Sequence, residues 1–182
     1  MSFNSKKQLI GFLAEDIGKK DITSNLLPKK KISARIISRE NAILGGITHV
    51  KTIFEINGCK AKILKKDGSI IKPNQDLIII TGDARKILTC ERTALNILTR
   101  MSGIATQTNY LVKKIPKKVK IYATRKTAPG LRYFDKEAVE IGGGKKHRLR
   151  LDEMVMIKDN HIAINESLLD LIKKAKRKYK KF

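Results

Sequence analysis

The sequence predicts an α/β protein in which an N-terminal α+β sandwich domain is followed by segments that alternate between strand and helix. Residues 32–82 read as strand, strand, helix, strand, strand, an order typical of a sandwich rather than of βαβ repeats. Residues 118–178 hold short apolar runs separated by helical patterns. With 182 residues and 41% hydrophobic content, the chain is long enough to bury a core.

The elements of the N-terminal part follow from hydrophobic spacing and from the residues that end each run. Apolar residues three or four apart predict helices, short apolar runs predict strands, and Gly or Asn-Gly ends them. The predicted elements are a helix at 6–18, strands at 32–39, 42–44, 59–65 and 76–82, and a helix at 47–56. We interpret the polar residues Asp21, Thr23 and Ser24 as capping chemistry without a catalytic role.

Residues 86–115 carry the clearest helical signal, an apolar stripe at a spacing of 3.6 residues. A second side of this region is apolar as well, which predicts burial within the fold or at a subunit contact. Gly103 is the predicted break between two helices, and Pro116 ends the region. We place the boundary between two domains here, with residues 1–107 forming the first and 108–182 the second.

The second domain is predicted to begin with a strand at 118–123. A helix ended by glycine follows at 136–144, then a strand at 151–157 and a basic helix at 163–178. Cationic clusters follow the runs of this part: Arg125 with Lys126, His147 with Arg148, and Lys158. If the runs are parallel strands, these clusters lie at the carboxyl ends, where α/β folds place their sites. Arg, Lys and His together suit a small ligand with several negative groups.

The net charge of +23 permits two interpretations. Binding to nucleic acid is one, but the lysine runs lack interleaved aromatic residues, and no known nucleic-acid motif is present. We favour a compositional bias toward lysine and expect no specific nucleic-acid partner. The two cysteines and three histidines form neither a disulfide framework nor a local zinc motif. No run approaches the ~20 apolar residues of a membrane span, so we expect a cytoplasmic protein without a membrane partner.

The stretch from Lys120 to His161 resembles the quinolinate phosphoribosyltransferases, also called carboxylating nicotinate-nucleotide pyrophosphorylases. The similar pieces there are TRKTAPGLR, KEAV, GGGKKHR and LDEMVMIKDNH. Upstream, LAEDIGKKDITSNLLP, ARIISRENAILGG, DGSIIKPNQ and GDARKILTCERTALNILTRMSGIAT also resemble the family, in the same order. This order along nearly the whole chain is more specific than any one motif.

The resemblance implies that quinolinate and 5-phosphoribosyl 1-diphosphate react to form nicotinate mononucleotide, pyrophosphate and carbon dioxide, in NAD biosynthesis. It implies Mg²⁺ bound with the phosphoribosyl diphosphate, and a homodimer or higher assembly in which Arg92 reaches the partner's site. It also assigns substrate-binding roles to a set of polar residues, with Lys126 the catalytic candidate as well. The set is Arg92, Thr124, Arg125, Lys126, His147, Arg148 and Lys158.

Two substitutions depart from the family pattern: Ala123 stands where Asp is common, and Arg150 where glycine is usual. The larger departure is length, because a full eight-stranded barrel takes about 250 residues. The resemblance therefore implies an N-terminal domain followed by an incomplete α/β barrel domain. A fragment, a truncated gene and one half of a split enzyme stay open as explanations, the last with a separate chain supplying the missing strands. We expect this chain alone not to turn over.

One further alternative concerns the substrate. A relative of the same fold could act on another small acid, such as nicotinate. The three cations Arg125, Arg148 and Lys158 together favour a dicarboxylate over a monocarboxylate.

Overall fold

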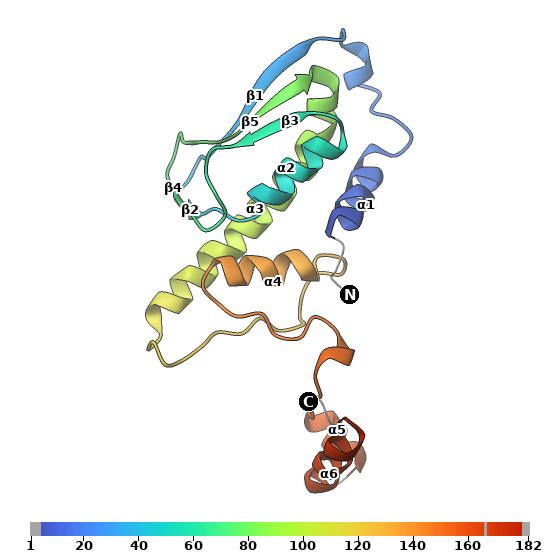
Figure 1. Cartoon of the computed structure of the whole chain (residues 1–182), viewed down its shortest axis with the longest axis vertical. Coiled ribbons are helices and arrows are strands. Elements are labelled where there is room, and N and C mark those ends of the chain that lie inside the picture. The colour runs from blue at the N-terminus through green and yellow to red at the C-terminus, as the bar shows by residue number, and fades with distance from the viewer. Residues whose placement is uncertain (1–4, 166, 180–182) are drawn as a thin grey trace. The chain divides into compact units, whose positions relative to one another are not determined.

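The computed structural model describes residues 5–165 and 167–179, and it separates into two compact units. The first unit is Met1–His147 and the second is Arg148–Phe182 (Figure 1). The first holds both sheets and the helices α1 to α4, while the second holds only helices in its described part. The mixed α/β class predicted from the sequence is confirmed.

The first unit is built on a three-stranded antiparallel sheet in the order β1-β5-β3, formed by Lys31–Ile37, Asp76–Asp83 and Lys60–Ile63. Ile78 and Ile80 of the central strand are fully buried or nearly so, because residues two apart on a strand share one face. A second pair, β2 (Ala42–Ile43) and β4 (Ile70–Ile71), is also antiparallel. The predicted turn at Gly68 is confirmed by a φ of 85°, but the two-residue strand β4 after it was not predicted.

The first three helices of the chain contribute to the core of the first unit. They are α1 (Ser5–Ile17), α2 (Ile47–Ile56) and α3 (Ala84–Lys114). Their buried residues form one cluster with the sheet, in which Leu9, Ile53 and Met101 are fully buried. The short 3₁₀ helix Ser24–Leu26 lies at the polar turn. There the Asp21 side chain accepts from the backbone N–H of Ser24 at 2.9 Å, which agrees with capping.

The long helix α3 runs without interruption through Gly103, so the predicted break at this residue is wrong. Met101 and Ala105, on either side of the glycine, are both fully buried in the core of the unit. Packing on both sides therefore holds the helix in one piece despite the poor helix propensity of glycine. The predicted domain boundary between residues 107 and 108 falls inside this helix, and it stays a prediction.

Helix α4 (Arg132–Ile141) lies against α3, as Figure 1 shows. It begins four residues earlier than predicted and ends at the first of three consecutive glycines. Phe134 and Ala138 of α4 are fully buried. A hydrogen bond of 2.6 Å between His49 Nε2 and Glu137 Oε2 joins α4 to α2. This helix is therefore part of the same compact unit as the sheet.

The predicted strand at 118–123 is wrong. Only Tyr122 pairs there, in a single parallel bridge with Lys145. A strand needs a neighbouring strand that accepts and donates backbone hydrogen bonds along its length, and the pairing here extends over only one bridge. Lys117, Lys118 and Lys120 are exposed, which gives the first half of this segment nothing to bury.

The second unit holds the 3₁₀ turn Leu151–Glu153, α5 (Asp159–Asn165) and α6 (Leu168–Lys178). The strand predicted at 151–157 is wrong, because no described segment pairs with it. The helix predicted at 163–178 is in fact two helices. Its apolar residues were predicted to lie inside, but Leu169 is 70% exposed and α6 has no buried residue. None of the described helices is long and apolar enough to cross a membrane.

Candidate active site

The backbone around the parallel bridge brings two segments of the first unit together. Ala123 N donates to Lys145 O at 2.9 Å, and Lys145 N donates to Ile121 O at 2.8 Å. The chain then continues from Ala123 into the loop that carries Thr124, Arg125 and Lys126, and from Lys145 toward His147. This short pairing places the starts of two cationic segments side by side.

A cavity of about 320 Å³ lies between this loop, α3 and α4. Two of the predicted site residues, Thr124 and Lys126, line it. Thr124 Oγ1 accepts a hydrogen bond of 3.1 Å from Lys126 N, so the loop is locally ordered. The complete lining is Arg100, Ile104, Ala123, Thr124, Lys126, Thr127, Ala128, Asp135, Lys136 and Val139.

An ion pair between α3 and α4 forms one wall of the cavity. Arg100 Nε and Nη2 donate to Asp135 Oδ1 and Oδ2 at 2.6 and 2.9 Å, which is bidentate geometry. The hydrogen bond to Asp135 raises the pKa of Arg100, so the guanidinium stays charged. Asp135 is buried, with 6% of its surface exposed. The two charges of this wall therefore balance each other.

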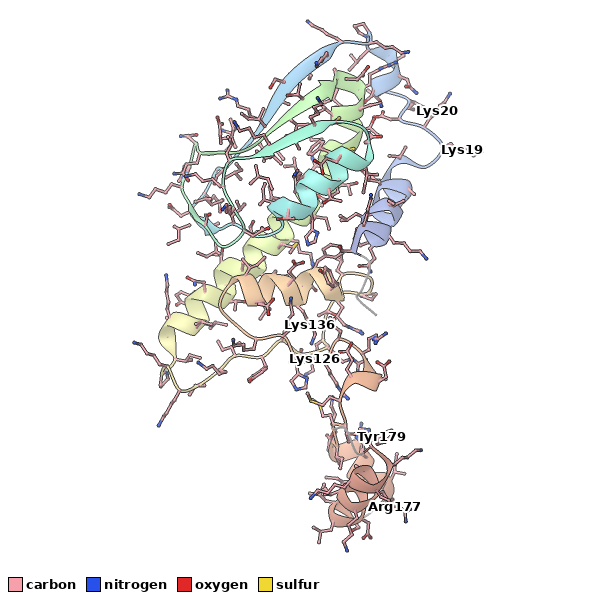
Figure 2. The ribbon with its side chains drawn as sticks, in the orientation of Figure 1. Lys19, Lys20, Lys126, Lys136, Arg177 and Tyr179 are labelled. Atoms are coloured by element: carbon pink, nitrogen blue, oxygen red, sulfur yellow. The ribbon has the colours of Figure 1, made fainter. Side chains whose placement is uncertain are left out.

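Lys136 is fully buried beside that pair and points from α4 toward the loop that carries Lys126, as Figure 2 shows. Its Nζ donates to Ala123 O at 3.2 Å and to His147 O at 3.0 Å. Lys126 itself is exposed, and its side chain makes no hydrogen bond or ion pair with the described residues. The cavity is thus lined by one exposed lysine, Lys126, and by one buried lysine, Lys136.

The other predicted residues of the first unit lie outside this lining. Arg125 Nε is buried, yet it has no hydrogen-bond partner among the described residues. The ring of His147 is half-buried and edge-on to Tyr122, with 6.1 Å between centroids. Arg92 is exposed on α3, eight residues before Arg100, which is about 12 Å along a helix.

The remaining two predicted residues belong to the second unit. Arg148 is buried at 9% exposure, and its Nη1 donates to Met154 O at 2.6 Å. Nearby, the hydrogen bond from Leu149 N to Glu153 lowers the pKa of Glu153 and orders this turn. Lys158 is exposed, and its backbone N–H donates to His161 Nδ1 at 3.0 Å.

The three consecutive glycines pack against α3. A Cβ on Gly142 would lie 2.5 Å from Ala105 O, and one on Gly144 would lie 2.6 Å from Val139 Cγ1. Gly143 has a φ of 95°, a backbone conformation that favours glycine. Close packing and a left-handed turn therefore account for all three glycines.

The sequence interpretation missed three charged residues of the cavity: Arg100, Asp135 and Lys136. The sequence did carry a signal for Lys136, because this lysine lies between the apolar residues Phe134 and Val139 of α4. Arg100 similarly stands between the buried Leu98 and Met101. A charged residue between buried apolar neighbours on a helix indicates a partner on another element, but not which one.

Clusters of metal ligands and the two cysteines are the other groups of the chain that could be reactive. No group of three or more His, Cys, Asp or Glu in the described ranges 5–165 and 167–179 could hold a metal ion. Burial raises the pKa of the Cys90 thiol to about 11, so this group is protonated at neutral pH and a poor nucleophile.

Comparison with known proteins identifies the family. The family model described as "Quinolinate phosphoribosyl transferase, N-terminal domain" matches residues 21–102. The model of the corresponding C-terminal domain matches residues 104–182. The crystal structure of nicotinate-nucleotide pyrophosphorylase from Ehrlichia chaffeensis is 39% identical, with a TM-score of 0.92. That match covers 100% of this chain and 68% of the other. The chain belongs to the quinolinate phosphoribosyltransferase family.

Two archaeal relatives show how much of the family's length is present. The probable carboxylating nicotinate-nucleotide pyrophosphorylase of Archaeoglobus fulgidus is 44% identical over 164 residues, which are 88% of this chain and 62% of that protein. Its counterpart in Methanocaldococcus jannaschii is 47% identical over 157 residues, 84% of this chain and 55% of that protein. The chain therefore spans 55% to 62% of the length of these relatives.

Proposed function

We propose that this chain supplies the quinolinate-binding part of a carboxylating nicotinate-nucleotide pyrophosphorylase, in NAD biosynthesis. In this reaction the pyridine nitrogen of quinolinate attacks the anomeric carbon of 5-phosphoribosyl 1-diphosphate. Pyrophosphate leaves, the 2-carboxylate is lost as carbon dioxide, and nicotinate mononucleotide remains. The single observation that carries the proposal is that Thr124 and Lys126, predicted from the sequence, line one cavity in a chain of this family.

The charges around the cavity support an anionic ligand. The charge of Arg100 is balanced by Asp135, whereas the exposed ammonium of Lys126 is available to a carboxylate or a phosphate. Arg125 carries a buried Nε that lacks an acceptor among the described residues. An acceptor supplied by a ligand would remove the free-energy cost of that unsatisfied donor. These residues bind and orient the acid substrate, and this positioning is the larger part of their contribution to the reaction.

Magnesium is proposed to arrive with the phosphoribosyl diphosphate, as the family resemblance implies. Asp135 is the one carboxylate in the cavity lining, and both of its oxygens are bound by Arg100. A hard cation such as Mg²⁺ prefers several free oxygen ligands. The described cavity therefore does not fit a magnesium site of its own.

A cytoplasmic location of the protein stays a prediction.

The first test is the binding of quinolinate. Arg125→Ala is expected to weaken quinolinate binding about tenfold, the effect of losing one charge-assisted hydrogen bond. Isothermal titration calorimetry measures this, with nicotinate as the monocarboxylate comparison. Lys118→Ala is the matched control, because it removes an exposed cation that does not line the cavity. Equal affinity of the unaltered chain for quinolinate and nicotinate would contradict the proposal.

The second test concerns assembly. We propose a homodimer in which Arg92 completes the partner's site, since this exposed residue lies outside the cavity lining of its own chain. If sites are shared, mixing Arg92→Ala and Arg125→Ala chains creates dimers with one intact site. Random pairing then restores tight quinolinate binding at about a quarter of all sites. Calorimetric stoichiometry checks this, and a mixture that behaves as the average of the two variants argues against shared sites.

A further inference from the structure

Lys136 stands apart from the other lysines of this basic chain. It is the one lysine that is buried in the part of the chain that the structure describes, with no exposed surface. Removing an ammonium group from water costs free energy, and a methionine of similar size would fill the same space without that cost. A buried lysine at this position therefore needs a reason other than packing.

The contacts of Lys136 supply such a reason. Its Nζ donates to Ala123 O at 3.2 Å and to His147 O at 3.0 Å, so one side chain binds two separate segments. Both acceptors are backbone carbonyls at the positions where these segments reach the candidate site. Thr124 follows Ala123 directly, and His147 is itself a candidate. Fixing a carbonyl fixes the peptide plane, and with it the direction of the next residue.

The backbone pairing between these two segments is short. It is limited to the single bridge between Tyr122 and Lys145, and within the described ranges no strand ladder continues beyond it. The helix that carries Lys136 is, by contrast, firmly placed. Its neighbour Asp135 is bound bidentately by Arg100 of α3, and Phe134 is fully buried. Lys136 thus joins a well-anchored helix to two weakly paired segments.

We propose that Lys136 is a positioning residue, whose buried ammonium holds the Thr124–Lys126 loop and His147 in the arrangement that receives the acid substrate. This inference rests on the proposed function for the identity of the ligand. It does not place Lys136 in contact with that ligand. The residue acts through the carbonyls of Ala123 and His147.

The test compares three variants with the unaltered chain. Lys136→Met removes the hydrogen-bond donors while keeping a side chain of similar volume. Lys136→Arg keeps a cation with donors, and the adjacent cavity of about 320 Å³ leaves room for its longer side chain. Lys118→Met is the matched control, with the same change at an exposed position. Three quantities are measured for each: the melting temperature, the quinolinate dissociation constant, and hydrogen–deuterium exchange of the amides at 121–127 and 144–148.

For Lys136→Met we expect a nearly unchanged melting temperature, about tenfold weaker quinolinate binding, and faster exchange confined to the two segments. Lys136→Arg is expected to restore binding to within about threefold of the unaltered chain, since a donor cation is regained. Lys118→Met should change none of the three quantities.

Two results would overturn the inference. Unchanged exchange and unchanged quinolinate binding in Lys136→Met would show that the two hydrogen bonds position nothing. A lowered melting temperature with faster exchange throughout the first unit, not reversed by Lys136→Arg, would show a purely structural role. If the unaltered chain itself fails to bind quinolinate, the proposed function fails, and the exchange of the two segments still decides whether Lys136 holds them.

Discussion

Replacing Arg100, whose side chain is 37% exposed, with leucine is expected to lower the free energy of unfolding by about 2 to 3 kcal/mol, the cost of leaving the buried Asp135 carboxylate without its donor. Asp135, at 6% exposure, would keep its carboxylate in the wall of the cavity with no guanidinium opposite it. Urea denaturation followed by circular dichroism measures the change. The result would show that the wall between α3 and α4 depends on this pair.

Two controls separate this explanation from a simple loss of packing. Arg35→Leu breaks an exposed ion pair with Asp76, whose side chains are 59% and 32% exposed, and should cost less than about 1 kcal/mol. The double variant Arg100→Leu with Asp135→Leu should recover most of the lost stability, because no uncompensated charge remains. If the double variant is as unstable as Arg100→Leu alone, the buried charge is not the cause.

Gly142→Ala is expected to destabilise the chain by about 2 to 3 kcal/mol through overpacking. Its φ of −73° suits alanine, so backbone strain contributes nothing. The obstacle is steric: the new Cβ would lie 2.5 Å from Ala105 O and 2.7 Å from Thr108 Cβ. Because Ala105 O belongs to the backbone of α3, it cannot rotate away, and α4 must shift instead. Such a shift would also move Asp135 and Lys136 in the cavity wall.

The same substitution at Gly103 provides the control. Gly103 lies within α3, and a Cβ there would meet nothing within 4 Å. Alanine is favoured over glycine inside a helix by about 0.5 to 1 kcal/mol, so Gly103→Ala should stabilise the chain by that amount. Thermal and urea unfolding of both variants checks the pair. Similar effects at the two glycines would contradict the close packing of Gly142 against α3.

Helix α2 shows how far local sequence signals reach. It was predicted at residues 47–56 and is found at Ile47–Ile56. Helical spacing of apolar residues and the Asn57–Gly58 stop are both contained within a dozen residues, and Gly58 adopts the left-handed φ of 78° expected after a helix. The strands predicted at 118–123 and 151–157 failed for the opposite reason. A strand depends on a partner elsewhere in the chain, and apolar runs do not show whether that partner is present.

The sequence by itself determined the mixed α/β class, the family resemblance, and Thr124 and Lys126 as candidates, because these depend on local pattern and motif order. Only the tertiary structure revealed that Arg100, Asp135 and Lys136 complete the cavity around them. Arg100 and Asp135 are 35 residues apart, and Lys136 bonds to carbonyls 13 and 11 residues away. Hydrogen bonds to a backbone carbonyl leave no mark in the sequence of the acceptor, since every residue has one. The packing of α4 against α3 therefore decided which charged residues stand in the candidate site.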